Sequence, residues 1–316
     1  MPGTFLIEQE YLPGRHRVFS GVCFLQRIDK GGKTKGLVNF FSADNFHDIA
    51  FPAQPSCLKI QLKTSIFFQP TMKPPTKLLS SIAFFLTAAY SPCAEKPVHV
   101  FILSGQSNMA GMNPATGFAP EAKKLFPGDE VVYFKIARGG QPIRLWVEEW
   151  NDIAGKHDLK PRINATTYYK PILERFAAIT KEHPNPKSVT FCWMQGERDA
   201  KEQLSSAYAD AMKQLIANLR RDLKQPGMNF VIGRLSDCRN DKSWESVRQS
   251  QVNVANADPR GSWVDCDDLN DKEKNGVKRN DLHYTKEGYE LLGRRYARQA
   301  KALITGKTPA KNGRPD

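Results

Sequence analysis

The stretch that decides the fold is Val98–Met112, which reads VHVFILSGQSNMAGM. Its first six residues are mostly apolar and favour a buried strand, which ends at the following Ser-Gly pair. The polar GQSN turn then presents the hydroxyl of Ser107 at the carboxyl end of a parallel sheet, where open α/β sheets bind their ligands. A serine in this place is a nucleophile if a base reaches it, and otherwise caps the next helix.

Two later segments end in the same way. Ser188–Asp199, SVTFCWMQGERD, is a second apolar run, and it passes into polar residues at Gln195. Asn280–Gly288, NDLHYTKEG, places Asp281 two positions before His283 and just before a predicted helix. The chain therefore offers a hydroxyl, an amide donor and an acid–imidazole pair, each at the end of an element.

The motifs GQSNMAG, RGG and WMQGE, followed by a histidine near the C-terminus, resemble the SGNH hydrolase superfamily. Within it the chain is most similar to carbohydrate esterase family 6 and the sialate O-acetylesterases, over residues 96–304. The resemblance implies a three-layer α/β/α sandwich around a flavodoxin-like parallel sheet. It also implies a secreted serine esterase that removes O-acetyl groups from carbohydrates of the acetylxylan or sialate type, without a metal or cofactor.

The resemblance assigns the catalytic roles residue by residue. Ser107 attacks the acetyl carbonyl, and His283 takes its proton and returns it to the leaving sugar oxygen. The oxyanion is held by the backbone N–H of Ser107, by a backbone N–H of the RGG turn and by the side chain of Gln195. We prefer Gly140 to Gly139 as the donor from this turn. The same two glycines also turn the chain after a strand, and the two roles are compatible.

The resemblance also predicts the residues that contact the substrate: Gln106, Asn108, Gly139 and Glu197. The family's glutamate lies at the rim of the site, so Glu197 is expected to hold a sugar hydroxyl or a neighbouring main-chain group. The alternative is that Glu197 and Asp199 simply occupy the first turn of the next helix, where carboxylates favour the positive end of the dipole. For Asp199 we prefer that alternative.

The histidine motif departs from the family pattern. The orienting aspartate normally stands three residues before the histidine, and here that position is Asn280. We predict that Asp281 reaches round to orient His283. Two alternatives stay open: Asn280 holds the imidazole by a hydrogen bond, or Ser107 and His283 act as a dyad.

Composition sets limits on the partners. The 316 residues suffice for one domain of about 210 residues plus additional sequence. The formal charge of +13 comes without an aromatic platform among the basic residues, which argues against a nucleic-acid partner. The cysteines lack metal-site spacing, although a Cys238–Cys266 disulfide is conceivable in an exported protein. We expect an acetylated carbohydrate as substrate; the sequence does not give the oligomeric state.

The N-terminal third contains a predicted targeting segment. Residues 72–94 have a basic start, an apolar core shorter than a membrane span and small residues after it, as secretory signal peptides do. We predict export to the periplasm or the cell exterior, with no membrane insertion after signal removal. Residues 1–71 are then an upstream mis-annotated or disordered segment. The alternative is a small N-terminal domain in which 78–90 form a buried core helix. The esterase domain spans 95–305, and 306–316 form a flexible tail.

Strands and helices alternate through the esterase domain, which predicts right-handed crossovers and a parallel five-stranded sheet covered on both faces. Within the longest predicted helix, apolar residues recur every three or four positions and indicate a buried stripe. The expected strands are 97–103, 130–136, 188–194, 228–235 and 262–266; the expected helices are 166–183, 199–223, 243–257 and 285–304.

The segment 137–165 is predicted to be an irregular loop that shapes the substrate cleft. Trp146 and Trp150 are candidates for stacking on sugar rings, whereas Trp193 is expected in the core. Two other functions stay open. The shifted aspartate is compatible with a catalytically weak carbohydrate-binding relative. An SGNH lipase or thioesterase for longer acyl esters would need an apolar acyl channel, and the loop is polar and aromatic.

Overall fold

The computed structural model describes residues 20–28, 34–42, 96–163 and 166–316. The chain divides into two units, Met1–Tyr90 and Ser91–Asp316. In the first unit the described residues form an antiparallel hairpin of β1 (Ser20–Ile28) and β2 (Thr34–Ser42). The predicted signal segment 72–94 lies outside the described residues, as does the rest of 1–71. The predictions for both segments therefore stay predictions.

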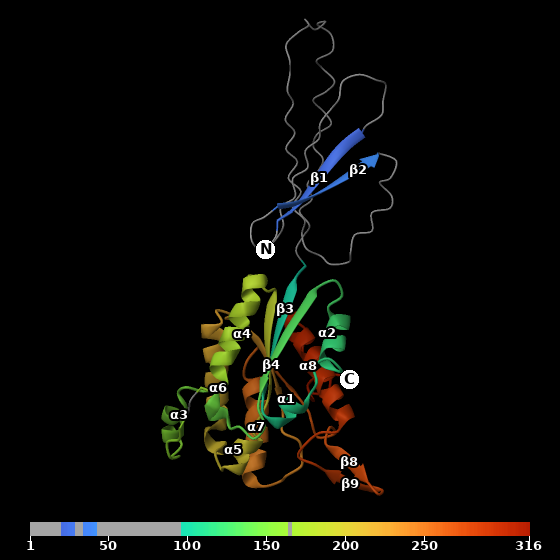
Figure 1. Ribbon diagram of the computed structural model, residues 1–316. Helices are drawn as coiled ribbons and strands as arrows, with labels where there is room; N and C mark the ends of the chain where they lie inside the picture. Colours follow the sequence, from blue (N-terminus) through green and yellow to red (C-terminus); the bar gives the residue numbers. More distant parts are fainter. Residues whose placement is uncertain (1–19, 29–33, 43–95, 164–165) are drawn as a thin grey trace, which may run out of the picture. The chain divides into compact units, whose positions relative to one another are not determined.

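The second unit is built on a parallel sheet of five strands in the order β4-β3-β5-β6-β7 (Figure 1). Numbered within this sheet alone, the order is 2-1-3-4-5, which is the flavodoxin-like order. The predicted sheet is therefore confirmed. Its strands are β3 (Val98–Gly105), β4 (Glu130–Ala137), β5 (Ser188–Met194), β6 (Asn229–Gly233) and β7 (Gly261–Val264).

Helices cover both faces of this sheet, which confirms the predicted three layers (Figure 1). The helices α2 and α8 pack together on one face, and α4, α6 and α7 cover the other. None of the described helices is long and apolar enough to span a membrane. The bounds are α2 (Phe118–Leu125), α4 (Tyr169–Glu182), α6 (Ser205–Asp222), α7 (Lys242–Asn256) and α8 (Lys286–Ile304).

The helix predicted over 199–223 is in fact two helices. The short α5 (Glu197–Lys201) ends before Gln203, whose φ of 58° lies in the left-handed region. The backbone N–H of Leu204 then donates to the Asp199 carbonyl at 2.9 Å, and α6 begins at the next residue, Ser205. The predicted apolar stripe is nevertheless buried, as expected: Leu204, Tyr208, Met212, Leu215 and Leu219.

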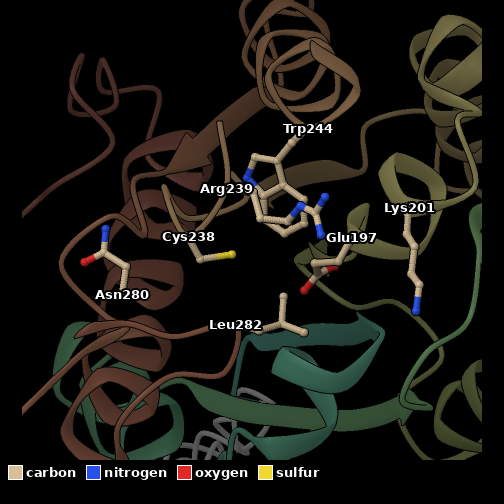
Figure 2. Close-up of a pocket in the computed structure, with 7 residues that line it drawn as sticks. All are labelled: Glu197, Lys201, Cys238, Arg239, Trp244, Asn280 and Leu282. Atoms are coloured by element: carbon tan, nitrogen blue, oxygen red, sulfur yellow. The ribbon is translucent and has the colours of Figure 1, made fainter. Parts of the chain in front are cut away.

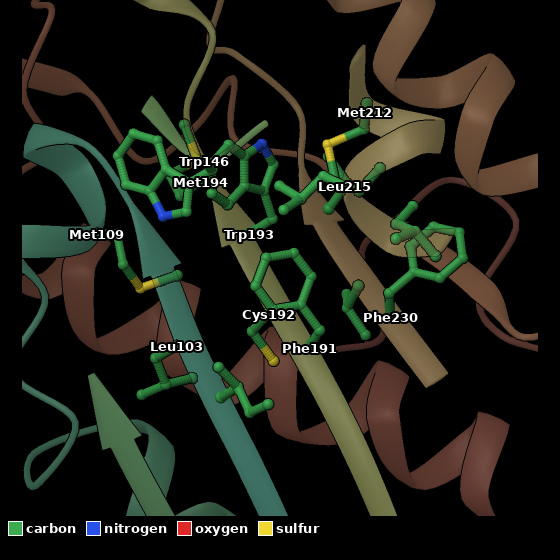
Figure 3. Packing of buried hydrophobic residues seen from close by; sticks show 14 of the residues in the cluster. Leu103, Met109, Trp146, Phe191, Cys192, Trp193, Met194, Met212, Leu215 and Phe230 are labelled. Atoms are coloured by element: carbon green, nitrogen blue, oxygen red, sulfur yellow. The ribbon is translucent and has the colours of Figure 1, made fainter. Parts of the chain in front are cut away.

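The segment 137–165 is less irregular than predicted, because it contains a 3₁₀ turn, η2 (Ile143–Leu145), and α3 (Trp150–Lys156). The prediction that Trp146 and Trp150 stack on sugars is wrong, since both side chains are fully buried. Trp146 meets the core residue Trp193 edge to face, with ring centroids 5.1 Å apart (Figure 3). Its indole N–H donates to the Ser104 hydroxyl at 3.0 Å, which provides the polar partner that a buried tryptophan needs.

Residues 306–316 are held in place, in contrast to the predicted flexible tail. The reason is the guanidinium of Arg295 on α8, which is 1% exposed and needs carboxylate partners. It binds Asp268 at 2.7 Å and the side chain of Asp316 at 3.0 Å. The side chain of Gln299 adds hydrogen bonds to both the N–H and the carbonyl of Ala310.

The connection from β7 to α8 contains a small antiparallel hairpin, β8 (Asp271–Lys274) and β9 (Val277–Asn280). This hairpin delivers the chain to the His283 segment at the start of α8. The thiols of Cys238 and Cys266 are free, so the conceivable disulfide between them is not formed.

Candidate active site

Ser107 lies at the switch point of the sheet, where the strand order reverses beside β3 and where α/β folds of this topology bind ligands. It is the first residue of α1 (Ser107–Gly111) and is partly exposed. The turn before it requires a glycine, because Gly105 has φ of +144° and a Cβ there would overlap the Met194 carbonyl. The hydroxyl makes no hydrogen bond within the described residues, and it therefore stands free at the carboxyl edge of the sheet.

The RGG turn lies beside this serine. The backbone N–H of Arg138 donates to the Gly105 carbonyl at 3.1 Å, which joins the ends of β4 and β3. A Cβ built on Gly139 would lie 3.7 Å from the Cβ of Ser107, whereas one on Gly140 would meet nothing within 4 Å. Gly140 has φ of +70°, a conformation that favours glycine. Gly139 is therefore the glycine that faces the Ser107 side chain, and Gly140 follows it in the same turn.

Gln195 follows β5 and is fully buried. Its amide nitrogen donates to the Asp199 carboxylate and, at 3.0 Å, to the Gln141 carbonyl. It also lies 3.4 Å from the side-chain oxygen of Gln106, a predicted substrate contact that is itself 3% exposed. In this arrangement the hydrogens of the Gln195 amide are directed to acceptors within the protein.

Asn108 joins the three segments that the sequence singled out. It is 1% exposed, and its amide nitrogen donates to Glu197 Oε1 and to the Leu282 carbonyl, both at 3.0 Å. Its amide oxygen accepts from the Tyr289 hydroxyl at 3.1 Å. The serine turn, the QGE turn and the histidine loop therefore meet at the residue that directly follows Ser107.

His283 is exposed on the loop that Asn108 holds. Its backbone N–H donates to Asp281 Oδ1 at 3.3 Å, while Asp281 Oδ2 pairs with Lys272 at 2.9 Å. The hydrogen bond from Lys272 holds the pKa of Asp281 below its usual value. Within the described residues the His283 imidazole makes no hydrogen bond to Ser107 or to Asp281. The structure brings the histidine loop to the serine turn without forming a triad, and the triad stays a prediction.

Glu197 is a buried acid with one unused oxygen. Its side chain accepts from Asn108 through Oε1, whereas Oε2 has no partner within the described structure. Burial raises the pKa of Glu197 to about 7. A carboxyl in this environment exchanges protons near neutral pH and has an acceptor left for a ligand.

Glu197 also lines a cavity of about 310 Å³ (Figure 2). The cavity brings together the end of β5, the segment after β6 and the loop after β9. Sequence reasoning missed most of its residues, although several follow strand ends, which is the signal that identified Ser107 and Gln195. The lining residues are Glu197, Lys201, Cys238, Arg239, Trp244, Asn280 and Leu282.

The five-stranded sheet has the flavodoxin-like order that the sequence predicts, and Ser107 lies at its switch point. The chain belongs to the carbohydrate esterase family of sialic acid-specific acetylesterases, whose family model matches residues 111–302. This range covers the RGG turn, Gln195, Glu197 and His283, and it begins four residues after Ser107. The predicted family is therefore confirmed.

Individual relatives agree with this assignment. A probable carbohydrate esterase of Arabidopsis thaliana is 27% identical over 184 residues, which are 56% of this chain and 62% of that protein. The match thus spans somewhat less than two thirds of the relative's length. A solved structure of a carbohydrate acetylesterase from Xanthomonas citri has a TM-score of 0.50 at 17% identity, covering 66% of this chain and 57% of that one. That likeness supports the fold alone.

Proposed function

We propose that this protein is a carbohydrate O-acetylesterase that uses Ser107 as its nucleophile. The observation that carries the proposal is the convergence of the serine turn, the QGE turn and the histidine loop on Asn108. Asn108 is the next residue after Ser107, so a carboxyl group and the loop that carries the imidazole are both bound one residue away from the free hydroxyl. Acyl transfer to a serine needs groups of these kinds at this place.

In the proposed reaction, Ser107 Oγ attacks the acetyl carbonyl while His283 accepts the hydroxyl proton. The C–O bond to the sugar then breaks, and the imidazolium returns the proton to the sugar oxygen. Water hydrolyses the acetyl-serine by the same steps in the second half-reaction. The proposed transfer requires the exposed His283 side chain to turn toward Ser107, and its loop is held next to the serine turn by the Asn108–Leu282 hydrogen bond.

Backbone N–H groups supply the oxyanion site in this proposal. The N–H of Ser107 lies at the N-terminus of α1, and the N–H of Gly140 belongs to the turn beside the serine. Gln195 would add its amide when substrate displaces the Gln141 carbonyl from it. Donors of this type each contribute about 100- to 1,000-fold in rate.

The sugar is proposed to occupy the cavity beside Glu197. The unpartnered Oε2 of Glu197 can accept a hydrogen bond from a sugar hydroxyl, which would satisfy a buried acceptor that folding leaves unused. Gln106 and Gly139 would flank the acetyl end of the substrate. The acetylated carbohydrate is of the acetylxylan or sialate type.

We also propose that residues 72–94 direct export, so that the enzyme acts in the periplasm or outside the cell. The support is the charge and hydropathy pattern of this segment. N-terminal sequencing of the native protein tests it. A mature N-terminus near residue 95 is expected, and a peptide from residues 1–71 in the mature protein would contradict it.

A catalytically weak carbohydrate-binding protein is the second candidate, because the His283 ring makes no hydrogen bond to Ser107 within the described structure. Turnover separates the two functions. We expect the wild type to release acetate from p-nitrophenyl acetate and from acetylated xylan or O-acetyl sialate, with much slower release of octanoate from its ester. Binding of the acetylated sugar without turnover would favour the second candidate.

The Ser107→Ala variant tests the nucleophile, and Ser188→Ala is its matched control. Ser188 begins β5, at the opposite end of the strand from the site. Its hydroxyl is hydrogen-bonded to the His99 ring at 2.7 Å. Ser107→Ala should abolish acetate release, and Ser188→Ala should retain it. Acetate release by Ser107→Ala at the wild-type rate would overturn the proposed mechanism.

A further inference from the structure

Asp199 is a buried acid whose contacts differ from those of an ordinary residue in a first helical turn. It is the third residue of α5, and its side chain is 0% exposed. Asp152 holds the same position in α3, where it is exposed to solvent. Stabilising a helix dipole requires no burial, so the position of Asp199 has another physical reason.

The carboxylate of Asp199 connects two strand ends. It accepts a hydrogen bond from the Gln195 amide at the end of β5. It also accepts the backbone N–H of Ile143, with distances of 3.0 Å to Oδ2 and 3.3 Å to Oδ1. Ile143 lies three residues after Gly140 on the segment that follows β4. We call residues 138–143 the RGG segment. A single carboxylate therefore links the Gln195 side chain to this segment.

The linkage closes into a ring. The Gln195 amide also donates to the carbonyl of Gln141, two residues before Ile143. Gln195 and the RGG segment are thus connected both directly and through Asp199. A buried network of this kind fixes the positions of its members, because any member that moves leaves an unpaired polar group in the interior.

We propose that Asp199 is a positioning residue that holds the Gln195 amide and the RGG segment in register beside Ser107. The inference rests on the proposed esterase function, because these are the two segments proposed to bind the oxyanion. Asp199 touches no substrate itself. It acts through the two segments that flank the serine.

The first test is Asp199→Asn. The asparagine has the same shape, but it has a single acceptor oxygen for two donors, and its own amide group would face one of them. We expect kcat to fall about tenfold or more with a change in KM below about twofold, because displaced oxyanion donors act on the transition state. Two controls should keep the wild-type kcat: Asp152→Asn, and Glu121→Gln, which neutralises a nearly buried acid in the first turn of α2.

The second readout does not depend on turnover. Hydrogen exchange at the Ile143 amide should accelerate in Asp199→Asn and stay unchanged in Glu121→Gln, since Asp199 is the acceptor of that N–H. A wild-type kcat in Asp199→Asn, or unchanged exchange at Ile143, would overturn the inference.

The double variant Gln195→Glu/Asp199→Asn reverses the polarity of the pair and covers the case in which Asp199→Asn does not fold. The asparagine amide can donate to the new carboxylate, whereas the Gln141 carbonyl loses its donor, so we expect folding and only part of the thermal stability to return. Activity should not return, because a carboxylate cannot donate to an oxyanion. Recovery of the wild-type kcat would overturn the inference. If the wild type releases no acetate from any ester, the proposed function fails; if it is active and Asp199→Asn matches it, the inference alone fails.

Discussion

The His283 imidazole and the Asp281 carboxylate are neighbours on one loop, yet their contacts predict unequal importance. One carboxylate oxygen of Asp281 pairs with Lys272, and the other accepts the backbone N–H of His283. The Asp281 side chain is 45% exposed. We expect His283→Ala to lose about 1,000-fold or more in kcat/KM, because it removes the proposed base. Asp281→Asn should lose less than about tenfold, because an exposed ion pair contributes little. Kinetics on p-nitrophenyl acetate check both values.

Lys272→Met is the control for that comparison. It breaks the same ion pair from the other side and leaves the Asp281 carboxylate in place. If Asp281 acts through loop structure, the two variants should have similar kinetics. A loss in Asp281→Asn as large as that in His283→Ala would instead identify Asp281 as an essential orienting acid.

Glu197 and Asp199 give the protein a specific pH dependence of stability. Burial raises the pKa of both carboxyls to about 7, whereas carboxyls in an unfolded chain titrate near about 4. Between these values the folded protein retains protons that the unfolded chain has released. These two groups therefore lower the free energy of unfolding as the pH rises from about 4.5 to 7.

Glu197→Gln removes one of these titrations and keeps an acceptor oxygen for Asn108. We expect the variant to lose less unfolding free energy than the wild type between pH 5 and pH 7, measured by urea denaturation at both values. Every other titrating group is present in both proteins, so the difference reports on Glu197. Parallel losses in the two proteins would show that Glu197 is ionised throughout this range.

At the level of elements, the serine turn, the QGE turn and the histidine loop depend on one side chain. Asn108→Ala removes the hydrogen bonds to Glu197 and Leu282 and leaves the buried Glu197 without its donor. We expect a loss of about 1–3 kcal/mol in unfolding free energy and a fall in kcat, since the loop carrying His283 is released. Asn113→Ala is the control, because among the described residues the Asn113 side chain hydrogen-bonds only to the backbone N–H of Ala115 in an exposed turn.

Hydrogen exchange distinguishes a local effect of the lost Asn108 hydrogen bonds from a general loss of stability. Exchange across residues 281–285 should accelerate in Asn108→Ala more than exchange in β6. A uniform acceleration across the whole domain, with kcat retained, would contradict the proposed coupling.

The predicted strands and most predicted helices are correct because their signals are local. An apolar run that stops at a polar turn identifies β3 and β5 without knowledge of the rest of the chain. The contacts of Asn108 have no such signal, because they join residues that are 89 and 174 positions apart. The sequence also gives no signal for the break between α5 and α6. The apolar stripe of α6 begins at Leu204, inside the break, so the apolar periodicity predicts one continuous helix.

At the scale of the whole molecule, non-local burial explains the remaining errors. Trp146 belongs to a segment with no periodicity, and its burial follows from its hydrogen bond to Ser104 and its contact with Trp193. The composition of residues 306–316 is typical of a mobile tail, yet the segment is bound to α8 through the ion pair between Arg295 and Asp316. A buried arginine on a helix resembles a surface arginine in sequence until its partners are known.

The C-terminal segment should therefore contribute to stability. A chain that ends at Thr305 loses the Asp316 partner of Arg295 and the hydrogen bonds of Gln299 to Ala310. We expect its Tm to fall by several degrees, at about 2–4 °C per kcal/mol for a domain of this size. Within the described structure the segment contacts neither Ser107 nor Gln195, so kcat well below Tm should be retained. An unchanged Tm would show that the segment does not hold Arg295 in solution.

The central claim is that Ser107 is the nucleophile, and covalent labelling tests it most directly. The full-length protein is treated with a fluorophosphonate that reacts with activated serines, and the adduct is located by peptide mass spectrometry. We predict one adduct, on the peptide that contains Ser107, present in Ser188→Ala and absent in Ser107→Ala. An adduct on another serine in an enzyme that still releases acetate, with Ser107 unmodified, would contradict the account.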